Sequence, residues 1–192
     1  MRVEATRRDQ LVRAAIEEIG NAGSASVTVS QIAKRAGVSS ALAFHYFGDK
    51  QQLFLGAMRH VLREYQGEVR RSLANAETPA ARLHAVIQAS FAPINFERHI
   101  VSAWLVFYVT AQQSQDAAKL LRVYRRRLRS TLLYDLRRLN VPDPMATAES
   151  IGAMIDGLYI RQALSAQDAK AAIAIVEHHL DQALTAAAAT TR

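Results

Sequence analysis

The apolar residues of this chain recur every three or four positions along most of its length, and this spacing restricts the fold more than any other feature. The longest such face is formed by Phe54, Met58, Val61, Tyr65, Val69 and Leu73. Side chains at these intervals lie on one side of an α-helix. No segment alternates apolar and polar residues with β-branched enrichment, and the four prolines lie between the periodic segments. The sequence therefore predicts an all-α protein of about nine helices.

The helical segments are short near the N-terminus and longer after it. We predict a three-helix head at residues 1–48 and a larger helical bundle at residues 49–192. The first helix is expected to begin near Thr6 and to stop around Gly20–Gly23, because glycine suits a C-terminal cap. Pro93 is expected to end one helix of the bundle, so that the next begins at Asn95 or Phe96.

Charge and composition restrict the partners. The net charge of +7 and the isoelectric point of about 10.1 favour a polyanionic partner such as nucleic acid or an anionic membrane face, although an ordinary basic soluble protein has the same composition. No apolar run reaches the roughly 18 residues of a membrane span. The N-terminal stretch lacks the apolar core of a signal peptide, and no cysteine is present. We therefore expect a cytoplasmic protein with no disulfides and no membrane partner.

Residues 28–47 carry the signals of two short helices joined by a tight turn. Thr28 and Gln31 have the spacing of a capping box, and Gly37 permits a sharp turn. Ser39 can then cap a second helix. Two short helices with such a turn match the helix-turn-helix arrangement, whose second helix enters the major groove of DNA. The apolar seam between the two helices is expected to contain Ile32, Ala33, Ala36, Val38 and Leu42.

The outward side chains of the second helix are expected to contact DNA. They are polar or small, and they are Ser39, Ser40, Ala41, His45 and Tyr46. Hydroxyl, phenol and imidazole groups donate to phosphates or base edges, and a methyl group can meet a thymine methyl. Lys50 opens the next helix, where an ammonium and exposed backbone N–H groups together suit a phosphate. Phe44 and Phe47 are expected to face inward, because large apolar rings usually belong to the core.

Two segments resemble the N-terminal DNA-binding domain of TetR-type repressors: AAIEEIGNAG at 14–23 and TVSQIAKRAGVSSALAFHYFGDKQQLF at 28–54. Ala41 stands where that family frequently has glycine, and Phe44 where it commonly has tyrosine. The resemblance implies that the DNA backbone is contacted by Thr28, Ser39, Tyr46 and Lys50, and that bases lie near Ser40, Ala41 and His45. Ahead of the first helix, Arg2, Arg7 and Arg8 look like an arm that contacts phosphates or the minor groove; a solvated terminus is the alternative.

In repressors of this family the C-terminal body binds a small effector and also dimerises. Three body segments resemble a choline-responsive branch that controls glycine betaine synthesis: AWLVFYVTAQQ, YRRRLRSTLLYDLRRL and IGAMIDGLYIRQALS. The resemblance implies a choline-like quaternary ammonium effector. Other interpretations remain open. The protein could be a TetR-type repressor of a multidrug efflux pump that senses lipophilic cations, or a helical small-molecule binding module without a DNA function.

Aromatic faces bind quaternary ammonium groups, so the aromatic residues of the body are candidate effector contacts. They are Phe91, Phe96, Trp104, Phe107, Tyr108 and Tyr159. Plain core packing is the alternative for each ring. Asp156 or Glu97 could supply the counter-charge, and Asp156 lies one helical turn before Tyr159. Alternatively, Asp156 forms a salt bridge with Arg161 or with a neighbouring helix.

The last two helices, expected near 146–164 and 167–187, are predicted to pair with their symmetry mates in a homodimer. The apolar residues proposed for that contact are Ile151, Ile155, Leu158, Ile173, Val176, Leu180 and Leu184. A dimer places two heads on the two half-sites of a palindromic operator. The arginines at 125, 126, 127 and 129 point around much of their helix, which indicates a solvated face with ion pairs rather than a second DNA-binding stripe.

We found no constellation that supports catalysis or metal binding. His178 and His179 are adjacent on a helix and so face different directions, and His60, His84 and His99 are scattered along the chain. No phosphate-binding glycine loop and no nucleophile elbow are present. The sequence therefore predicts a non-enzymatic regulator with no cofactor and no metal.

Overall fold

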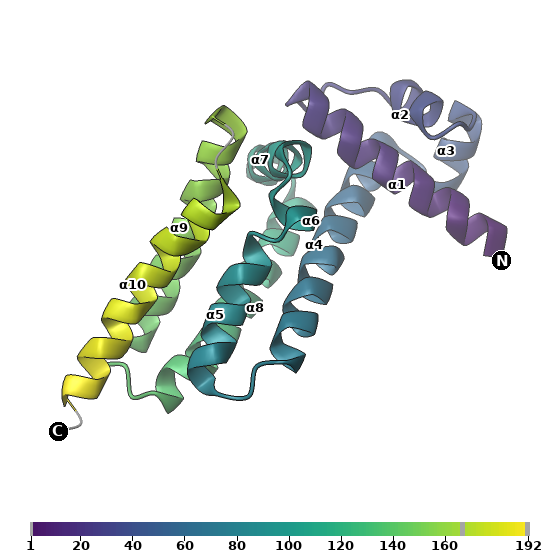
Figure 1. The fold of residues 1–192 in the computed structure, drawn as a ribbon. Helices are drawn as coiled ribbons and strands as arrows, with labels where there is room; N and C mark the ends of the chain where they lie inside the picture. Colours follow the sequence, from purple (N-terminus) through teal and green to yellow (C-terminus); the bar gives the residue numbers. More distant parts are fainter. Residues whose placement is uncertain (1, 166–167, 191–192) are drawn as a thin grey trace. The chain divides into compact units, whose positions relative to one another are not determined.

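The computed structural model describes residues 2–165 and 168–190, and every regular element in these ranges is an α-helix (Figure 1). The helices are α1 (Arg2–Ala22), α2 (Val29–Arg35), α3 (Ser40–Phe47), α4 (Lys50–Ala74), α5 (Pro79–Ser90), α6 (Pro93–Phe96), α7 (Arg98–Gln113), α8 (Gln115–Arg138), α9 (Pro144–Ser165) and α10 (Ala169–Thr190). The all-α prediction is confirmed. The described ranges hold one helix more than expected, because Pro93 opens a helix of its own. The predicted start of the last helix at Gln167 lies outside these ranges.

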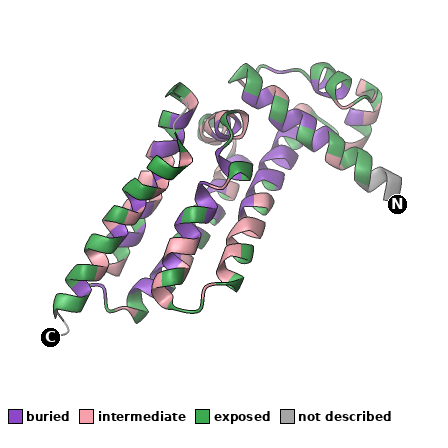
Figure 2. Ribbon diagram, viewed as in Figure 1, coloured by how far each residue is buried: buried purple, intermediate pink, exposed green. Residues whose placement is uncertain are grey.

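The chain divides into two compact units. The first combines Met1–Arg63 with Glu97–Leu121, and the second combines Glu64–Phe96 with Arg122–Arg192. The long helices α4 and α8 therefore each contribute to both units. Figure 2 shows that α4 is largely buried over its first turns and more exposed toward its C-terminal end.

In the first unit, α1 packs against α7 at very short range. Gly20 makes this approach possible, since a Cβ added there would lie 2.0 Å from the carbonyl oxygen of His99. The helix continues past Gly20 to Ala22, and Gly23 then adopts the left-handed backbone (φ 58°) that ends it. The buried apolar side chains of this unit include Leu11, Ala15, Ile19, Leu53, Ala57, Val101 and Trp104.

In the second unit, α10 packs against both α5 and α9. The core contains both aliphatic side chains and aromatic rings. The aliphatic ones include Leu83, Ile87, Leu132, Leu136, Ile151, Ile155, Val176 and Leu180, and the rings include Phe91, Phe96 and Tyr159. One carboxylate is buried beside this core. Asp135 is 1% exposed and accepts hydrogen bonds from Arg82 Nε at 2.9 Å and from an Arg138 guanidinium nitrogen at 3.1 Å.

The predicted dimer-contact residues need correction. Five of them are buried within a single chain, namely Ile151, Ile155, Leu158, Val176 and Leu180. A partner subunit cannot bury them again, so their assignment to a dimer interface was wrong. The reason is that α9 and α10 use these faces to pack within their own protomer. Large apolar side chains that α9 and α10 do expose are Met145, Ile160, Leu164 and Ile175.

Candidate DNA-binding surface and effector pockets

The two short helices α2 and α3 form as their sequence signals predicted. The Thr28 hydroxyl accepts the backbone N–H of Gln31 at 3.2 Å, and the Gln31 side chain accepts the backbone N–H of Thr28 at 2.7 Å. Gly37 turns the chain with φ 67°, and the Ser39 hydroxyl then accepts the N–H of Leu42 at 3.2 Å. Each cap satisfies an N–H that a short helix would otherwise leave unbonded. This is the helix-turn-helix geometry.

The predicted DNA-contact residues all lie at the surface of this unit. Thr28, Ser39, Ala41 and His45 are exposed, and Ser40, Tyr46 and Lys50 are half-buried. The rings of His45 and Tyr46 meet edge to face at 5.6 Å. Arg35 is held against α1 by ion pairs to Glu17 and Glu18, which brace α2 against that helix.

Phe47 and Phe44 differ, although both were expected to face inward. Phe47 is 8% exposed and packs beside Gly56, whose missing side chain leaves room for the ring. Phe44 is 48% exposed, so that expectation was wrong. The inward face of α3 is set by Ala43 and Phe47, four residues apart, and Phe44 lies about 100° round the helix from Ala43. Phe44 therefore stands on the outward face with the other candidate contacts.

The basic residues near the N-terminus belong to α1 rather than to an arm ahead of it. The helix begins at Arg2, because no glycine or proline interrupts the first residues, so the predicted start near Thr6 was late. Arg7 and Arg8 are exposed. The Arg8 guanidinium lies 5.0 Å from the centre of the Phe47 ring, which connects α1 to α3. The side chain of Arg2 lies outside the described residues.

At the start of α4, Lys50 Nζ lies 5.3 Å from the centre of the Phe54 ring. Asp49 caps this helix by accepting the N–H of Gln52 at 2.7 Å. A pocket of about 360 Å³ lies beside this turn, and its wall contains Lys50, Phe54 and Phe107. The candidate effector residue Phe107 therefore lies close to a candidate DNA-contact residue within the first unit.

The other candidate effector residues form two groups. Trp104 and Tyr108 stack on α7 with ring centres 6.0 Å apart, in the first unit. Phe91 and Tyr159 meet at 6.0 Å in the second unit, where Phe96 contacts both rings. The Tyr159 hydroxyl donates to the carbonyl oxygen of Ser90 at 2.5 Å. The structure thus brings Trp104 together with Tyr108, and Phe91 together with Tyr159.

Asp156 lines a pocket of about 290 Å³ between α8 and α9, together with Tyr124 and Glu149. Its carboxylate lies 3.8 Å from Arg125 on α8, so the ion pair that the sequence left open is made with a neighbouring helix. Glu149 in the same pocket is paired with Arg129 at 2.9 Å. The prediction of a solvated arginine face with ion pairs on α8 is confirmed for these two arginines.

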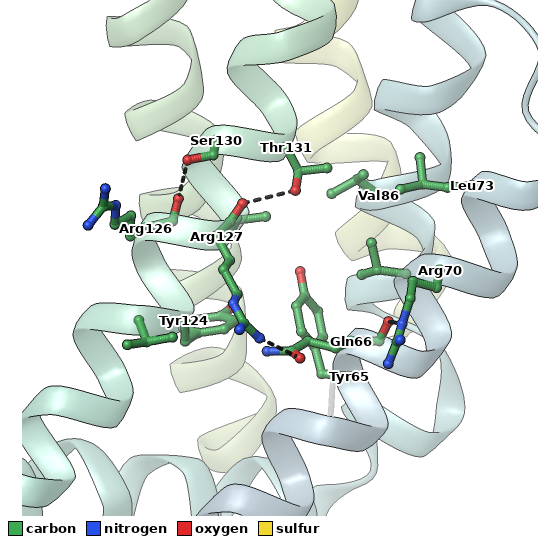
Figure 3. Close-up of a pocket in the computed structure, with 13 residues that line it drawn as sticks. Tyr65, Gln66, Arg70, Leu73, Val86, Tyr124, Arg126, Arg127, Ser130 and Thr131 are labelled. Atoms are coloured by element: carbon green, nitrogen blue, oxygen red, sulfur yellow. Dashed lines mark hydrogen bonds between the residues drawn. The ribbon is translucent and has the colours of Figure 1, made fainter.

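A larger pocket, of about 620 Å³, lies among α4, α5 and α8 (Figure 3). Tyr65 and Tyr124 stand at its base with ring centres 5.3 Å apart. The Tyr65 hydroxyl hydrogen-bonds Ser90, and burial raises the pKa of Tyr65 to about 12. The apolar spacing of α4 placed Tyr65 on a helix face, but this pocket was not predicted, because no sequence spacing links residues of α4 to residues of α8.

The chain matches two family descriptions in succession. Residues 11–57 match bacterial regulatory proteins of the tetR family, and residues 79–185 match the C-terminal domain of BetI-type transcriptional repressors. The chain belongs to the TetR family. Its C-terminal part is of the BetI type, so the protein is a transcriptional repressor and not an enzyme.

Named relatives agree with this assignment. The HTH-type transcriptional regulator BetI of Brucella anthropi is 49% identical over 181 residues, which are 93% of both chains. The regulator of the same name from Agrobacterium fabrum is 46% identical and covers 95% of this chain and 90% of its own.

Solved structures of low identity share the fold. A transcriptional regulator from Pseudomonas aeruginosa PAO1 aligns with a TM-score of 0.82 at 23% identity, over 98% of this chain and 95% of its own. A transcriptional regulator from Saccharomonospora viridis, solved in complex with choline, aligns with a TM-score of 0.83 at 19% identity, over 92% and 96% of the two chains.

The described residues offer neither a membrane span nor a metal site. None of the helices in the described ranges combines the length and apolar character that a membrane span needs. Within residues 2–165 and 168–190, no three His, Asp or Glu side chains gather where they could hold a metal ion.

Proposed function

We propose that this TetR-family protein is a dimeric repressor whose affinity for a palindromic operator depends on choline or a related quaternary ammonium compound. The observation that carries this proposal is the BetI-type match over residues 79–185, together with BetI relatives that align over nearly the whole chain. The choline complex of the Saccharomonospora viridis regulator supports the choice of ligand. The controlled genes would be those of glycine betaine synthesis, with residues 1–48 reading DNA and residues 49–192 binding the effector and dimerising.

Under this proposal α3 reads the major groove. Base edges lie near Ser40, Ala41 and His45, and phosphates are bound by Thr28, Ser39, Tyr46, Lys50, Arg7 and Arg8. The hydroxyl oxygen of Ser39 accepts the N–H of Leu42, so its proton is available to a phosphate. The Thr28 hydroxyl donates its proton to the Gln31 side-chain oxygen at 2.8 Å, so Thr28 would offer a phosphate this proton only by giving up that bond. The exposed ring of Phe44 adds an apolar contact of the kind that thymine methyl groups make.

We propose that α9 and α10 form the dimer interface with their outward faces. Ile160, Leu164 and Ile175 are large apolar side chains that a single chain leaves exposed on these helices. A symmetric partner would bury them, as in other two-fold interfaces that use one patch twice. Two heads separated by such an interface can reach two half-sites one helical turn, or a multiple of it, apart.

The proposed effector contacts are Phe91, Trp104, Phe107, Tyr108, Asp156 and Tyr159. Aromatic faces attract a quaternary ammonium by roughly 0.5–2 kcal/mol each. Asp156 is the carboxylate of this set, and it is half-buried, lines a pocket and lies 3.8 Å from Arg125. A bound cation could replace that arginine as the partner of the carboxylate.

The test is the fluorescence anisotropy of labelled promoter DNA from beside the protein's own gene, titrated at fixed salt with and without ligand. We expect millimolar choline to change the operator dissociation constant. The neutral analogue 3,3-dimethyl-1-butanol, which has the same shape without the charge, should have no effect. If neither choline nor betaine aldehyde changes operator affinity, the ligand assignment is wrong. A response to lipophilic cations of unrelated shapes would instead indicate a repressor of a multidrug efflux pump.

Two carboxylate variants make this test specific. Asp156→Asn should weaken the response to choline while leaving the operator affinity of the ligand-free protein unchanged. Glu149→Gln is the matched control, because Glu149 lines the same pocket but is engaged with Arg129 at 2.9 Å. Equal losses in the two variants would contradict a specific role for Asp156.

A further inference from the structure

The pocket among α4, α5 and α8 has an unusual distribution of charge. Three arginines line it, Arg70 from α4 and Arg126 and Arg127 from α8, and its wall contains no aspartate or glutamate. Among residues 2–165 and 168–190, none of these three guanidinium groups is ion-paired with a carboxylate. Neighbouring arginines do have such partners: Arg71 pairs with Glu68, and Arg129 with Glu149. In the described part of the chain, the three arginines that border the pocket are therefore free of the carboxylate contacts that hold Arg71 and Arg129.

Figure 3 shows that two of these arginines, Arg127 and Arg70, form hydrogen bonds with Gln66. The guanidinium of Arg127 extends from α8 toward α4 and donates to the side-chain oxygen of Gln66 at 2.7 Å. Arg70 donates from Nε to the backbone oxygen of Gln66 at 3.3 Å. Both arginines thus donate to uncharged oxygens of one residue, and an anion can replace these oxygens with stronger, charge-assisted hydrogen bonds.

The remaining wall is mostly apolar. It contains Val69 and Leu73 of α4, Val86 of α5, and Val123 and Leu128 of α8. The hydroxyls of Ser130 and Thr131 donate to backbone oxygens of their own helix, so they offer acceptors rather than donors to the pocket. A volume of about 620 Å³ is in the range of pockets that enclose a small organic molecule.

We infer that this pocket binds an amphipathic organic anion, with a carboxylate or phosphate head at Arg127 and Arg70 and an apolar body against Val69, Leu73 and Val86. A cation such as choline would meet three positive charges and no carboxylate in this wall. The site therefore differs in ligand from the Asp156 pocket, with which it shares Tyr124 and Leu128, and the inference does not depend on the proposed effector. Guanidinium groups suit such a head because their paired N–H donors match the geometry of carboxylate and phosphate oxygens.

Isothermal titration calorimetry on the full chain at low ionic strength tests this inference. Decanoate and decyltrimethylammonium have the same apolar tail and opposite head charges, and both are used below the concentrations at which they aggregate. We expect decanoate to bind at least about tenfold more tightly. A third titration, with decyl phosphate, identifies the head group of the ligand. Tighter binding of decyl phosphate than of decanoate indicates a phosphate, and tighter binding of decanoate indicates a carboxylate. Equal binding of the anionic and cationic amphiphiles would overturn the inference, because it would show apolar adsorption alone.

Variants locate the site. Arg127→Gln and Arg70→Gln should each weaken decanoate binding by about fivefold to tenfold, since each removes one charge-assisted contact. Arg122→Gln is the matched control, because Arg122 is an exposed arginine of α8 that does not line the pocket. Gln66→Glu should weaken binding as strongly as the arginine variants by supplying an internal carboxylate to Arg127. Unchanged decanoate affinity in Arg127→Gln and Gln66→Glu would refute the assignment.

Discussion

Replacing Gly20 by alanine tests how closely α1 and α7 must approach. An alanine Cβ at this position would lie 2.0 Å from the carbonyl oxygen of His99, 2.7 Å from its carbonyl carbon and 3.0 Å from its Cα. Since all three are backbone atoms, no side-chain rotation relieves the overlap. To reach even 3.0 Å from the oxygen, one helix must move by at least 1.0 Å (3.0 − 2.0) relative to the other.

The expected loss of stability follows from that movement. A gap of 0.5–1 Å already removes about a quarter to a half of the dispersion attraction of each contact, and forcing extra atoms into a packed core costs about 1–3 kcal/mol. Alanine in place of glycine inside a helix normally gains about 0.5–1 kcal/mol. We therefore expect Gly20→Ala to lower the free energy of unfolding by a net amount of about 2 kcal/mol, which corresponds to a fall in Tm of about 4–8 °C for a chain of this size.

Urea unfolding followed by far-ultraviolet circular dichroism, at one protein concentration, measures this change. The matched control is Gly67→Ala, because Gly67 is also inside a helix and its added Cβ would meet only the flexible end of Arg71, at 3.4 Å. The control should be neutral or slightly stabilising. If Gly20→Ala is as stable as Gly67→Ala, the contact between α1 and α7 does not depend on glycine and the reasoning is wrong.

Three further predictions concern charge and burial. In urea titrations, Asp135→Ala should lower the free energy of unfolding by about 3 kcal/mol, because it leaves Arg82 unpaired beside the core. Removal of the exposed carboxylate of Glu149, which pairs with Arg129, should cost less than about 1 kcal/mol. Burial raises the pKa of Tyr65 to about 12, so between pH 10 and pH 12 the unfolded chain loses the phenol proton while the folded chain keeps it. The free energy of unfolding should therefore fall by an amount on the order of 2 kcal/mol across this pH range. The Tyr65→Phe variant should lack this fall. In anisotropy titrations, Lys50→Ala should weaken binding to different operator sequences by similar factors. It should also reduce the salt dependence of the operator affinity by about one phosphate contact. Unequal losses of affinity across operator sequences would contradict a contact between Lys50 and the DNA backbone.

The local signals in the sequence predicted local structure well. The capping box of Thr28 and Gln31, the cap at Ser39 and the turn at Gly37 all form as expected, because each depends only on residues a few positions apart. The exposure of Ala41 and His45 on α3 followed from the same short-range geometry. The family resemblance extended this to a TetR-type regulator, and the family assignment is confirmed.

Errors arose where burial depends on packing between elements. Phe44 and Phe47 have the same residue type and lie on the same helix, yet only Phe47 is buried, because the missing side chain of Gly56 on α4 leaves space for its ring. Ile155 and Ile160 also have the same residue type and lie on one helix, α9. Ile155 is buried and Ile160 is exposed, because only the face that carries Ile155 meets neighbouring helices. A single sequence contains the apolar spacing of each helix, but not which of its faces another part of the same chain will cover.

The sequence by itself determined the helices, their caps and the helix-turn-helix, since these follow from hydrogen bonds and side-chain periods within a few residues. Only the tertiary structure decided that Gly20 permits a close helix crossing, and that Arg70 and Arg127 converge on one pocket from helices far apart in the chain. The physical reason is that close packing and charge grouping are set by distances between elements. Those distances are fixed only when the apolar faces of all the helices in a unit are packed together.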